Sequence, residues 1–128
     1  MPQLALVVDD SMLIRHTVCR FLEEHGFAVE SATNGAEAVE MLRSILPDFI
    51  ITDLQMPKMD GYQLIDVLRS QTETADIPII ILMAKQHAED TRPQKCTRHV
   101  IYKDIDIEAQ LKRVLETLFP PASKSASG

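Results

Sequence analysis

The chain has 128 residues, 45% hydrophobic and 25% charged, which suits one globular domain and excludes a disordered, fibrous or collagen-like protein. Its net charge of −6, without a basic patch, argues against direct nucleic-acid binding. No apolar run is long enough to span a membrane and no basic leader precedes the first apolar run, so we expect a cytoplasmic protein.

Short apolar runs alternate along the chain with amphipathic patterns. Continuous apolar runs predict buried parallel strands, and apolar residues spaced three and four apart predict helices. In chain order, the patterns predict a strand at 4–8, a helix at 12–25, a strand at 27–33, a helix at 35–46, a strand at 48–52, a helix at 61–71, strands at 77–83 and 99–103, and a helix at 106–118.

The alternation of strands and helices is least clear in residues 84–98. They are polar, lack an apolar stripe and contain Pro93, and a proline inside a helix costs about 3 kcal/mol. We therefore expect a fourth helix that is short, irregular or absent. The alternation as a whole predicts an α/β fold, a three-layer, doubly wound sandwich around a parallel sheet. The domain should occupy 1–119, and the Pro- and Ser-rich residues 120–128 should form a flexible tail or linker stub.

Three aspartates stand where predicted strands end. Asp9 and Asp10 follow the first strand, and Asp53 follows the third. In the flavodoxin-like strand order 2-1-3-4-5 these strands are neighbours, and ligands bind at their carboxyl ends. Clustered carboxylates need a compensating cation, and hard oxygen ligands suit Mg²⁺. Lys103 ends the fifth strand at the same edge, where an ammonium group would suit a phosphoryl group.

Two sequence stretches carry a family resemblance. VVDDS (7–11) and TDLQMPKMDG (52–61), together with a lysine at the end of the fifth strand, resemble the receiver domain of two-component response regulators, the CheY-like family. The combination is specific, whereas either stretch alone would be weak. The resemblance spans residues 4–119, and it implies the strand order 2-1-3-4-5.

The resemblance implies a phospho-accepting signalling domain. Asp53 would take a phosphoryl group from a phosphohistidine of a histidine kinase or phosphotransfer protein, and Lys103 would pair with a phosphoryl oxygen. The domain would signal to a downstream protein by a conformational change. It would not be an enzyme in the usual sense, since it would catalyse at most its own phosphorylation and dephosphorylation.

The resemblance also implies a ligand set for Mg²⁺ and a shaped loop. Asp10, Asp53 and the backbone carbonyl of Gln55 would bind the metal directly, and Asp9 would act through a water molecule. Pro57 and Gly61 would shape the loop after the third strand, where we expect Gly61 to use its freedom to adopt positive φ.

The sequence departs from the family at the residues of its usual switch. Met83 stands where members carry Thr or Ser, and Val100 stands in place of an aromatic residue. Asp104 replaces the proline after the lysine, so we predict a trans bond between Lys103 and Asp104. With the unusual segment 84–98, these departures suggest that phosphorylation signals through a different element, such as ordering of 84–98.

The same departures leave other functions open. A pseudo-receiver would keep the fold as a protein-interaction module with lost or altered phosphate control. A phosphatase with an aspartate nucleophile would need a second acid two residues after Asp53, where Gln55 stands. A flavin or dinucleotide binder would need a glycine-rich turn after the first strand, where VDDSM stands.

Overall fold

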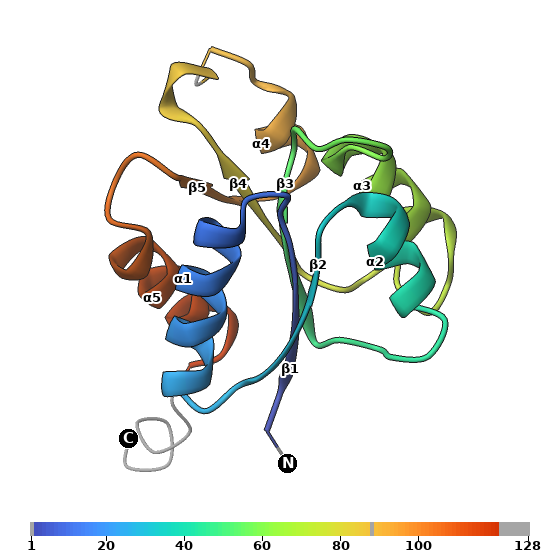
Figure 1. The fold of residues 1–128 in the computed structure, drawn as a ribbon, viewed down its shortest axis with the longest axis horizontal. Helices are drawn as coiled ribbons and strands as arrows, with labels where there is room; N and C mark the ends of the chain where they lie inside the picture. Colours follow the sequence, from blue (N-terminus) through green and yellow to red (C-terminus); the bar gives the residue numbers. More distant parts are fainter. Residues whose placement is uncertain (1, 88, 121–128) are drawn as a thin grey trace.

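The sheet has the predicted order. The computed structural model describes residues 2–87 and 89–120, and within them five strands form one parallel sheet in the order β2-β1-β3-β4-β5 (Figure 1). The elements are β1 (Leu4–Val8), α1 (Met12–Glu24), β2 (Ala28–Ala32), α2 (Gly35–Met41), β3 (Phe49–Asp53), α3 (Gly61–Ser70), β4 (Ile79–Met83), the 3-10 helix η1 (Lys85–His87), α4 (Arg92–Cys96), β5 (His99–Tyr102) and α5 (Ile107–Leu118).

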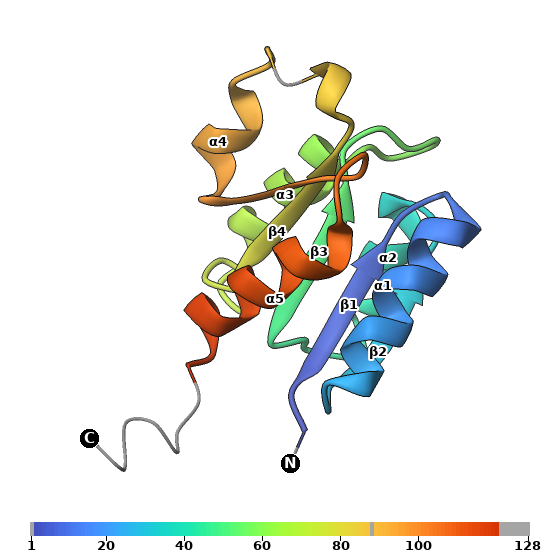
Figure 2. The same ribbon diagram turned by 90° about the vertical axis from the view of Figure 1, so that its left-hand side faces the viewer.

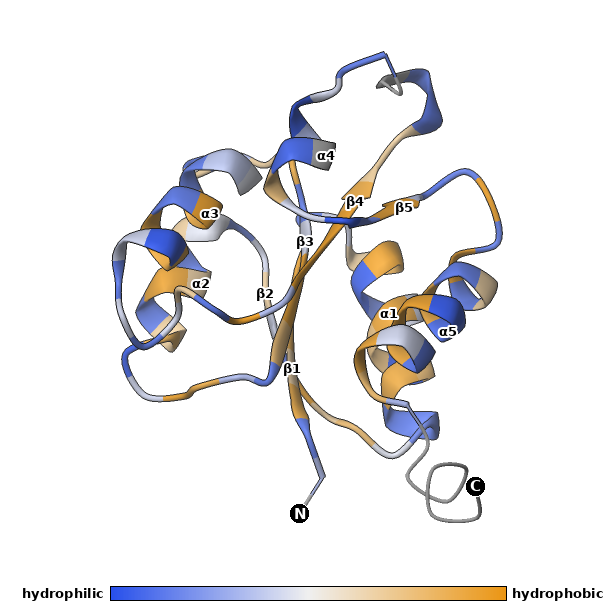
Figure 3. Cartoon of the chain, turned by 180° about the vertical axis from the view of Figure 1, so that it is seen from behind, coloured by the Kyte–Doolittle hydropathy of each residue, from blue (hydrophilic) through white to orange (hydrophobic). Residues whose placement is uncertain are grey.

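Two apolar layers cover the sheet. Helices α1 and α5 lie on one face, and α2 and α3 lie on the other (Figure 2). Successive residues of a strand point to opposite faces, so Ile51 packs on the α1 and α5 side and Ile50 on the α2 and α3 side. Every residue of β3 and β4 is buried, as the continuous apolar runs predict. Figure 3 shows these strands as an apolar centre between helices with mixed faces.

Helix α2 is shorter than predicted. The pattern predicts a helix over 35–46, but α2 ends at Met41. Beyond it, Ser44 donates from its amide and its hydroxyl to the Met41 carbonyl, so the chain turns there. Pro47 acts in the same direction, because the residue before a proline avoids the helical region. At the other end the Asn34 side chain caps the helix by accepting from the amide of Glu37 at 2.8 Å.

The fourth helix is short, as predicted. Helix α4 has five residues, and Pro93 lies in its first turn, where a missing amide hydrogen costs nothing. The hydroxyl of Thr97 then donates to the Ile79 carbonyl at 2.6 Å, which fixes the end of α4 to β4. With η1, α4 forms the top of the molecule in Figures 1 and 2.

Three further sequence predictions concern the peptide bond after Lys103, the tail and membrane-spanning segments. No peptide bond is cis in the described residues, so the bond between Lys103 and Asp104 is trans, as predicted. Of the predicted tail, residues 121–128 lie outside the described residues. None of the described helices combines the length and the apolar character that crossing a membrane requires.

The expectation of positive φ at Gly61 is wrong. In the loop between β3 and α3, Lys58 carries the positive φ, 67°. Gly61 is instead required by a close approach of two backbones. Its amide donates to the Leu54 carbonyl at 2.9 Å, and a β carbon on Gly61 would lie 2.8 Å from the α carbon of Leu54. This contact folds the loop back onto the end of β3.

Gly61→Ala tests that contact. We expect the added methyl group to lower the free energy of unfolding by about 2–3 kcal/mol, because the backbone at Leu54 has no flexible end to move aside. Gly26→Ala is the control: Gly26 has φ of 87° but open space around it, so the cost should be about 1 kcal/mol of backbone strain. Urea unfolding of both variants measures the difference. Equal costs would contradict the close approach.

Candidate functional site

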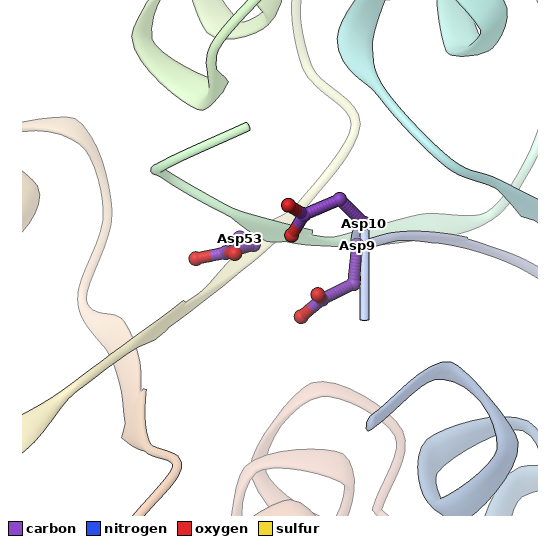
Figure 4. A group of neighbouring side chains, drawn as sticks. All are labelled: Asp9, Asp10 and Asp53. Atoms are coloured by element: carbon purple, nitrogen blue, oxygen red, sulfur yellow. The ribbon is translucent and has the colours of Figure 1, made fainter. Parts of the chain in front are cut away.

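The three aspartates converge, as predicted. Strands β1 and β3 pair in parallel with Val8 opposite Thr52, so the residues that follow them meet at one edge of the sheet. One carboxylate oxygen from each of Asp9, Asp10 and Asp53 lies within 4.8 Å of the others. Figure 4 shows Asp9 and Asp10 at the end of β1 with Asp53 beside them. Asp10 is exposed, whereas the other two side chains are buried.

Asp9 is held in place by the start of α1. Its Oδ1 accepts from the amide of Ser11 at 2.8 Å, and its carbonyl accepts from the Arg15 guanidinium at 2.8 Å. The residue is fully buried, and Oδ2 accepts no hydrogen bond from the described residues. Burial raises the pKa of Asp9, and the charge of Asp53 adds to the rise, although the Ser11 amide and Lys103 oppose it.

Asp53 divides its two oxygens between different partners. Its Oδ1 accepts from the amide of Leu54 at 2.7 Å and from that of Gln55 at 3.4 Å. Its Oδ2 lies 2.9 Å from Nζ of Lys103. These contacts orient the carboxylate at the carboxyl end of β3, where the ligands of such sheets bind.

Lys103 lies between the two buried carboxylates. Its Nζ is 3.2 Å from Asp9 Oδ2 as well as 2.9 Å from Asp53 Oδ2, and its side chain is 19% exposed. Burial alone would lower the pKa of Lys103, but its hydrogen bond with Asp53 and the charges of Asp53 and Asp9 raise it overall. The lysine therefore stays protonated at neutral pH, beside the carboxylate that it faces.

The donor set fits Mg²⁺. Every ligand atom that the three aspartates offer is a carboxylate oxygen, which is the hard donor that this ion prefers. Asp9 Oδ2 is buried and has only the ion-pair contact with Lys103, without an aligned hydrogen bond, so a metal or its water would satisfy it. Gln55 is exposed beside Asp53, and the structure places its backbone next to the cluster through the contact of its amide with Asp53.

An open cleft of about 690 Å³ lies over Asp53. Asp53 and Lys103 line it, together with Met83 at the end of β4, whose buried side chain offers no hydrogen-bond donor. The other lining residues are Leu54, Gln55, Met56, Asp60, Tyr62, Ala84, Asp90 and Arg92.

The remaining atypical positions lie around this cleft. Val100 is partly buried on the α2 and α3 side of the sheet, where Tyr102 also packs. Asp104 is exposed, and its Oδ2 accepts from the amide of Lys85 at 3.1 Å. Pro57 is exposed in the loop before Gly61.

One polar cluster in the cleft is not predicted by the sequence patterns. Asp90 accepts from the hydroxyl of Tyr62 at 3.1 Å and pairs with the Arg92 guanidinium, Nη2 to Oδ2, at 2.7 Å. Arg92 also lies over the Tyr62 ring, 4.6 Å from its centre. Tyr62 precedes Asp90 by 28 positions, so no local motif connects it to the pair of Asp90 and Arg92. The sequence signal near this cluster is the Arg92–Pro93 step, because proline is common at the start of a helix.

A family model of the response regulator receiver domain matches residues 5–115. The chain belongs to this family. Receiver domains of this kind serve two-component signalling, and the fold, the acidic cluster and the lysine all agree with that membership.

Relatives of this receiver domain include free-standing and longer proteins. The chain is 33% identical over 111 residues to Protein PilH of Pseudomonas aeruginosa, covering 85% of this chain and 92% of PilH. It is 37% identical over 90 residues to Response regulator MprA of Mycolicibacterium vanbaalenii, covering 70% of this chain. The match spans only 38% of MprA, so the receiver domain corresponds to a part of that protein.

Solved structures of related proteins have the same fold as this chain. The chemotaxis response regulator CheY4 of Vibrio cholerae superposes with a TM-score of 0.81 at 28% identity, covering 91% of this chain and 98% of that one. The receiver domain of a sensor histidine kinase of Pseudomonas aeruginosa has a TM-score of 0.81 at 25% identity, covering 91% and 97%. That structure has a magnesium ion coordinated in its active-site cleft.

Asp9→Asn tests the electrostatic cost of the cluster. A carboxyl group whose pKa is raised by folding favours the folded state in its neutral form, at low pH, and loses that contribution as pH rises through the folded-state pKa. At pH 7 the ionised, buried Asp9 therefore lowers stability. We expect Asp9→Asn to raise the free energy of unfolding by about 1 kcal/mol without Mg²⁺.

Asp10→Asn is the matched control, since Asp10 is exposed and its replacement should change the free energy of unfolding little. Urea unfolding at pH 7 in a chelating buffer measures both variants. A loss of stability in Asp9→Asn would mean that its pairing with Lys103 outweighs the cost of burial.

Proposed function

We propose that Asp53 accepts a phosphoryl group from the phosphohistidine of a histidine kinase or phosphotransfer protein. The observation that carries the proposal is the setting of its carboxylate. Asp53 lies at the cleft, oriented by two backbone amides on Oδ1 and by Lys103 on Oδ2, and beside two further carboxylates. Asp9 also contacts Lys103 and belongs to the cluster, but of the three aspartates it is Asp53 that lines the cleft.

The transfer balances without any other reactant. An oxygen of Asp53 forms a bond to phosphorus as the bond from phosphorus to the histidine nitrogen breaks, and the imidazole leaves with that electron pair. Lys103, already 2.9 Å from the carboxylate, faces the oxygens of the incoming group and offsets their charge. Positioning and charge neutralisation would supply most of the catalysis.

Mg²⁺ is the cofactor that the proposal implies. Asp10, Asp53 and the backbone carbonyl of Gln55 would hold it directly, and Asp9 would act through a water molecule. When bound, Mg²⁺ supplies positive charge against the phosphoryl oxygens. The buried Asp9 Oδ2, which has an ion-pair contact with Lys103 but no aligned hydrogen bond, and the oxygen-only donor set support this assignment.

The proposal extends to the setting of the protein. We infer a cytoplasmic signalling domain that acts through protein partners, a kinase or phosphotransfer protein on one side and a downstream target on the other. It would turn over only its own phosphoryl group, so we do not class it as an enzyme. Direct binding to nucleic acid is not part of the proposal, in keeping with the net charge of −6.

One observation favours a second function. Met83 and Ala84 line the cleft where a hydroxyl group would contact a phosphoryl oxygen, and neither side chain can donate a hydrogen bond. A pseudo-receiver, which keeps the fold as an interaction module without phosphate control, would tolerate such residues. Its phosphate chemistry would be lost or altered.

Mass spectrometry after incubation with Mg²⁺ and a small phosphodonor separates the two functions. We expect the wild-type chain to gain one phosphoryl group and Asp53→Asn, which keeps the shape of the side chain, to gain none. Asp66→Asn, a change on the exposed face of α3, should react like the wild type. An unmodified wild-type chain would favour the pseudo-receiver instead.

Metal binding is tested by stability. A ligand that binds only the folded state stabilises it by about 2.7 kcal/mol at a concentration 100 times its Kd. We therefore expect Mg²⁺ to raise the melting temperature of the wild type and of Asp66→Asn, and to have little effect on Asp10→Asn. An equal rise in all three would place the ion somewhere other than the acidic cluster.

A further inference from the structure

The cluster of Tyr62, Asp90 and Arg92 connects α4 to α3. Arg92, the first residue of α4, makes a forked contact with Asp90: Nη2 lies 2.7 Å from Oδ2, and Nε lies 3.0 Å from Oδ1. Asp90 in turn accepts from Tyr62, whose ring lies under the guanidinium. The hydrogen bonds from Arg92 and Tyr62 hold the pKa of Asp90 well below its usual range, so its carboxylate stays ionised.

This cluster lies on the same cleft as Asp53. Of the residues that line the cleft, Lys103 and Arg92 are the two with a positive charge. The ammonium group of Lys103 already contacts Asp9 and Asp53. Arg92 lines the same cleft as Met83 and Ala84, whose side chains carry no donor, so its guanidinium is the second cation that the cleft offers to an anion.

The contact between Arg92 and Asp90 is easily exchanged. The Arg92 side chain is 68% exposed, and exposed ion pairs are screened by solvent and contribute little. A phosphoryl group carries close to two negative charges and three acceptor oxygens, and the planar fork of a guanidinium matches it. A single carboxylate therefore competes poorly once such a group enters the cleft.

We propose that Arg92 binds the phosphoryl group carried by Asp53 and gives up Asp90 in doing so. The inference rests on the phosphorylation proposed above and names the residue that senses it. Arg92 replaces the missing hydroxyl at the end of β4, and because it is the first residue of α4, its movement carries that helix away from Tyr62. The far end of α4 stays fixed by the bond from Thr97 to Ile79.

Beryllofluoride, which forms a phosphoryl-like group on carboxylates in the presence of Mg²⁺, is the probe for this exchange. Fluorine NMR of the wild-type chain reports occupancy of Asp53, with Asp53→Asn as the blank. In the same sample, proton–nitrogen spectra follow the Arg92 Nε–H group. We expect its signal to move away from the position that the Tyr62 ring imposes, and the Arg92 amide, which bonds Asp90 Oδ1 at 3.0 Å, to exchange faster.

Variants at both ends of the ion pair give opposite results. Arg92→Gln should weaken the apparent affinity for beryllofluoride by about fivefold or more, because a charge-assisted hydrogen bond is lost. Arg92→Lys, which keeps the charge without the fork, should fall between Arg92→Gln and the wild type. Asp90→Asn should tighten binding, because it removes the charge that competes for Arg92. A merely structural role of the cluster would weaken binding in every variant.

Arg43→Gln is the matched control. Arg43 makes a similar exposed ion pair with Glu40, away from the cleft, so its replacement should leave the affinity unchanged. If beryllofluoride occupies Asp53 but the Arg92 signal stays in place and Arg92→Gln binds as the wild type does, Arg92 is not the sensor and phosphorylation of Asp53 still stands. If the wild type takes up no beryllofluoride, the proposed function fails and this inference with it.

Discussion

The ammonium group of Lys103 holds together a site that would otherwise repel itself. Two buried carboxylates, Asp9 and Asp53, each lie within 3.2 Å of Nζ, and exposed Asp10 adds a third charge nearby. Charges removed from water are tolerated only when they are paired. The pairing is incomplete, since Asp9 Oδ2 still lacks a hydrogen bond. The fold therefore carries a local electrostatic cost that a bound metal cation would relieve.

The parallel sheet creates this arrangement. Strands β1 and β3 are central neighbours, so the residues that follow them must emerge side by side, and the pairing of β4 with β5 brings Lys103 to the same edge. Fully buried strands leave these end residues little freedom. Gly61 then brings the loop after β3 back against Leu54, close to the carboxylate of Asp53. The apolar core thus fixes the geometry of the polar site.

The sequence predicts the elements with continuous apolar runs and the residues at their ends. The strand order follows from the family resemblance, and the convergence of the aspartates follows from that order and from their positions at the strand ends. The errors arise where contacts between residues distant in the sequence determine the local structure. At Gly61, the close approach of another backbone segment matters and φ does not. Asp90 and Arg92 meet Tyr62 only because the segment between β4 and β5 reaches the start of α3, and periodicity carries no information about that contact.

The two loops that leave the site are coupled to each other. Lys103 donates from its backbone amide to the Met83 carbonyl, and the next residue, Asp104, accepts from the amide of Lys85 at the start of η1. A displacement of Lys103 would therefore act through one peptide bond on the residue that holds η1. The start of the segment between β4 and β5 is thus bonded to Lys103 and to the residue that follows it. Through Arg92, the same segment also contacts Tyr62 across the cleft. Because α4 has only five residues and few partners, the free energy needed to move it is small compared with that of displacing a core helix. Under the proposed function, a charge change at Asp53 would therefore be read out by this segment while the rest of the sheet stays fixed.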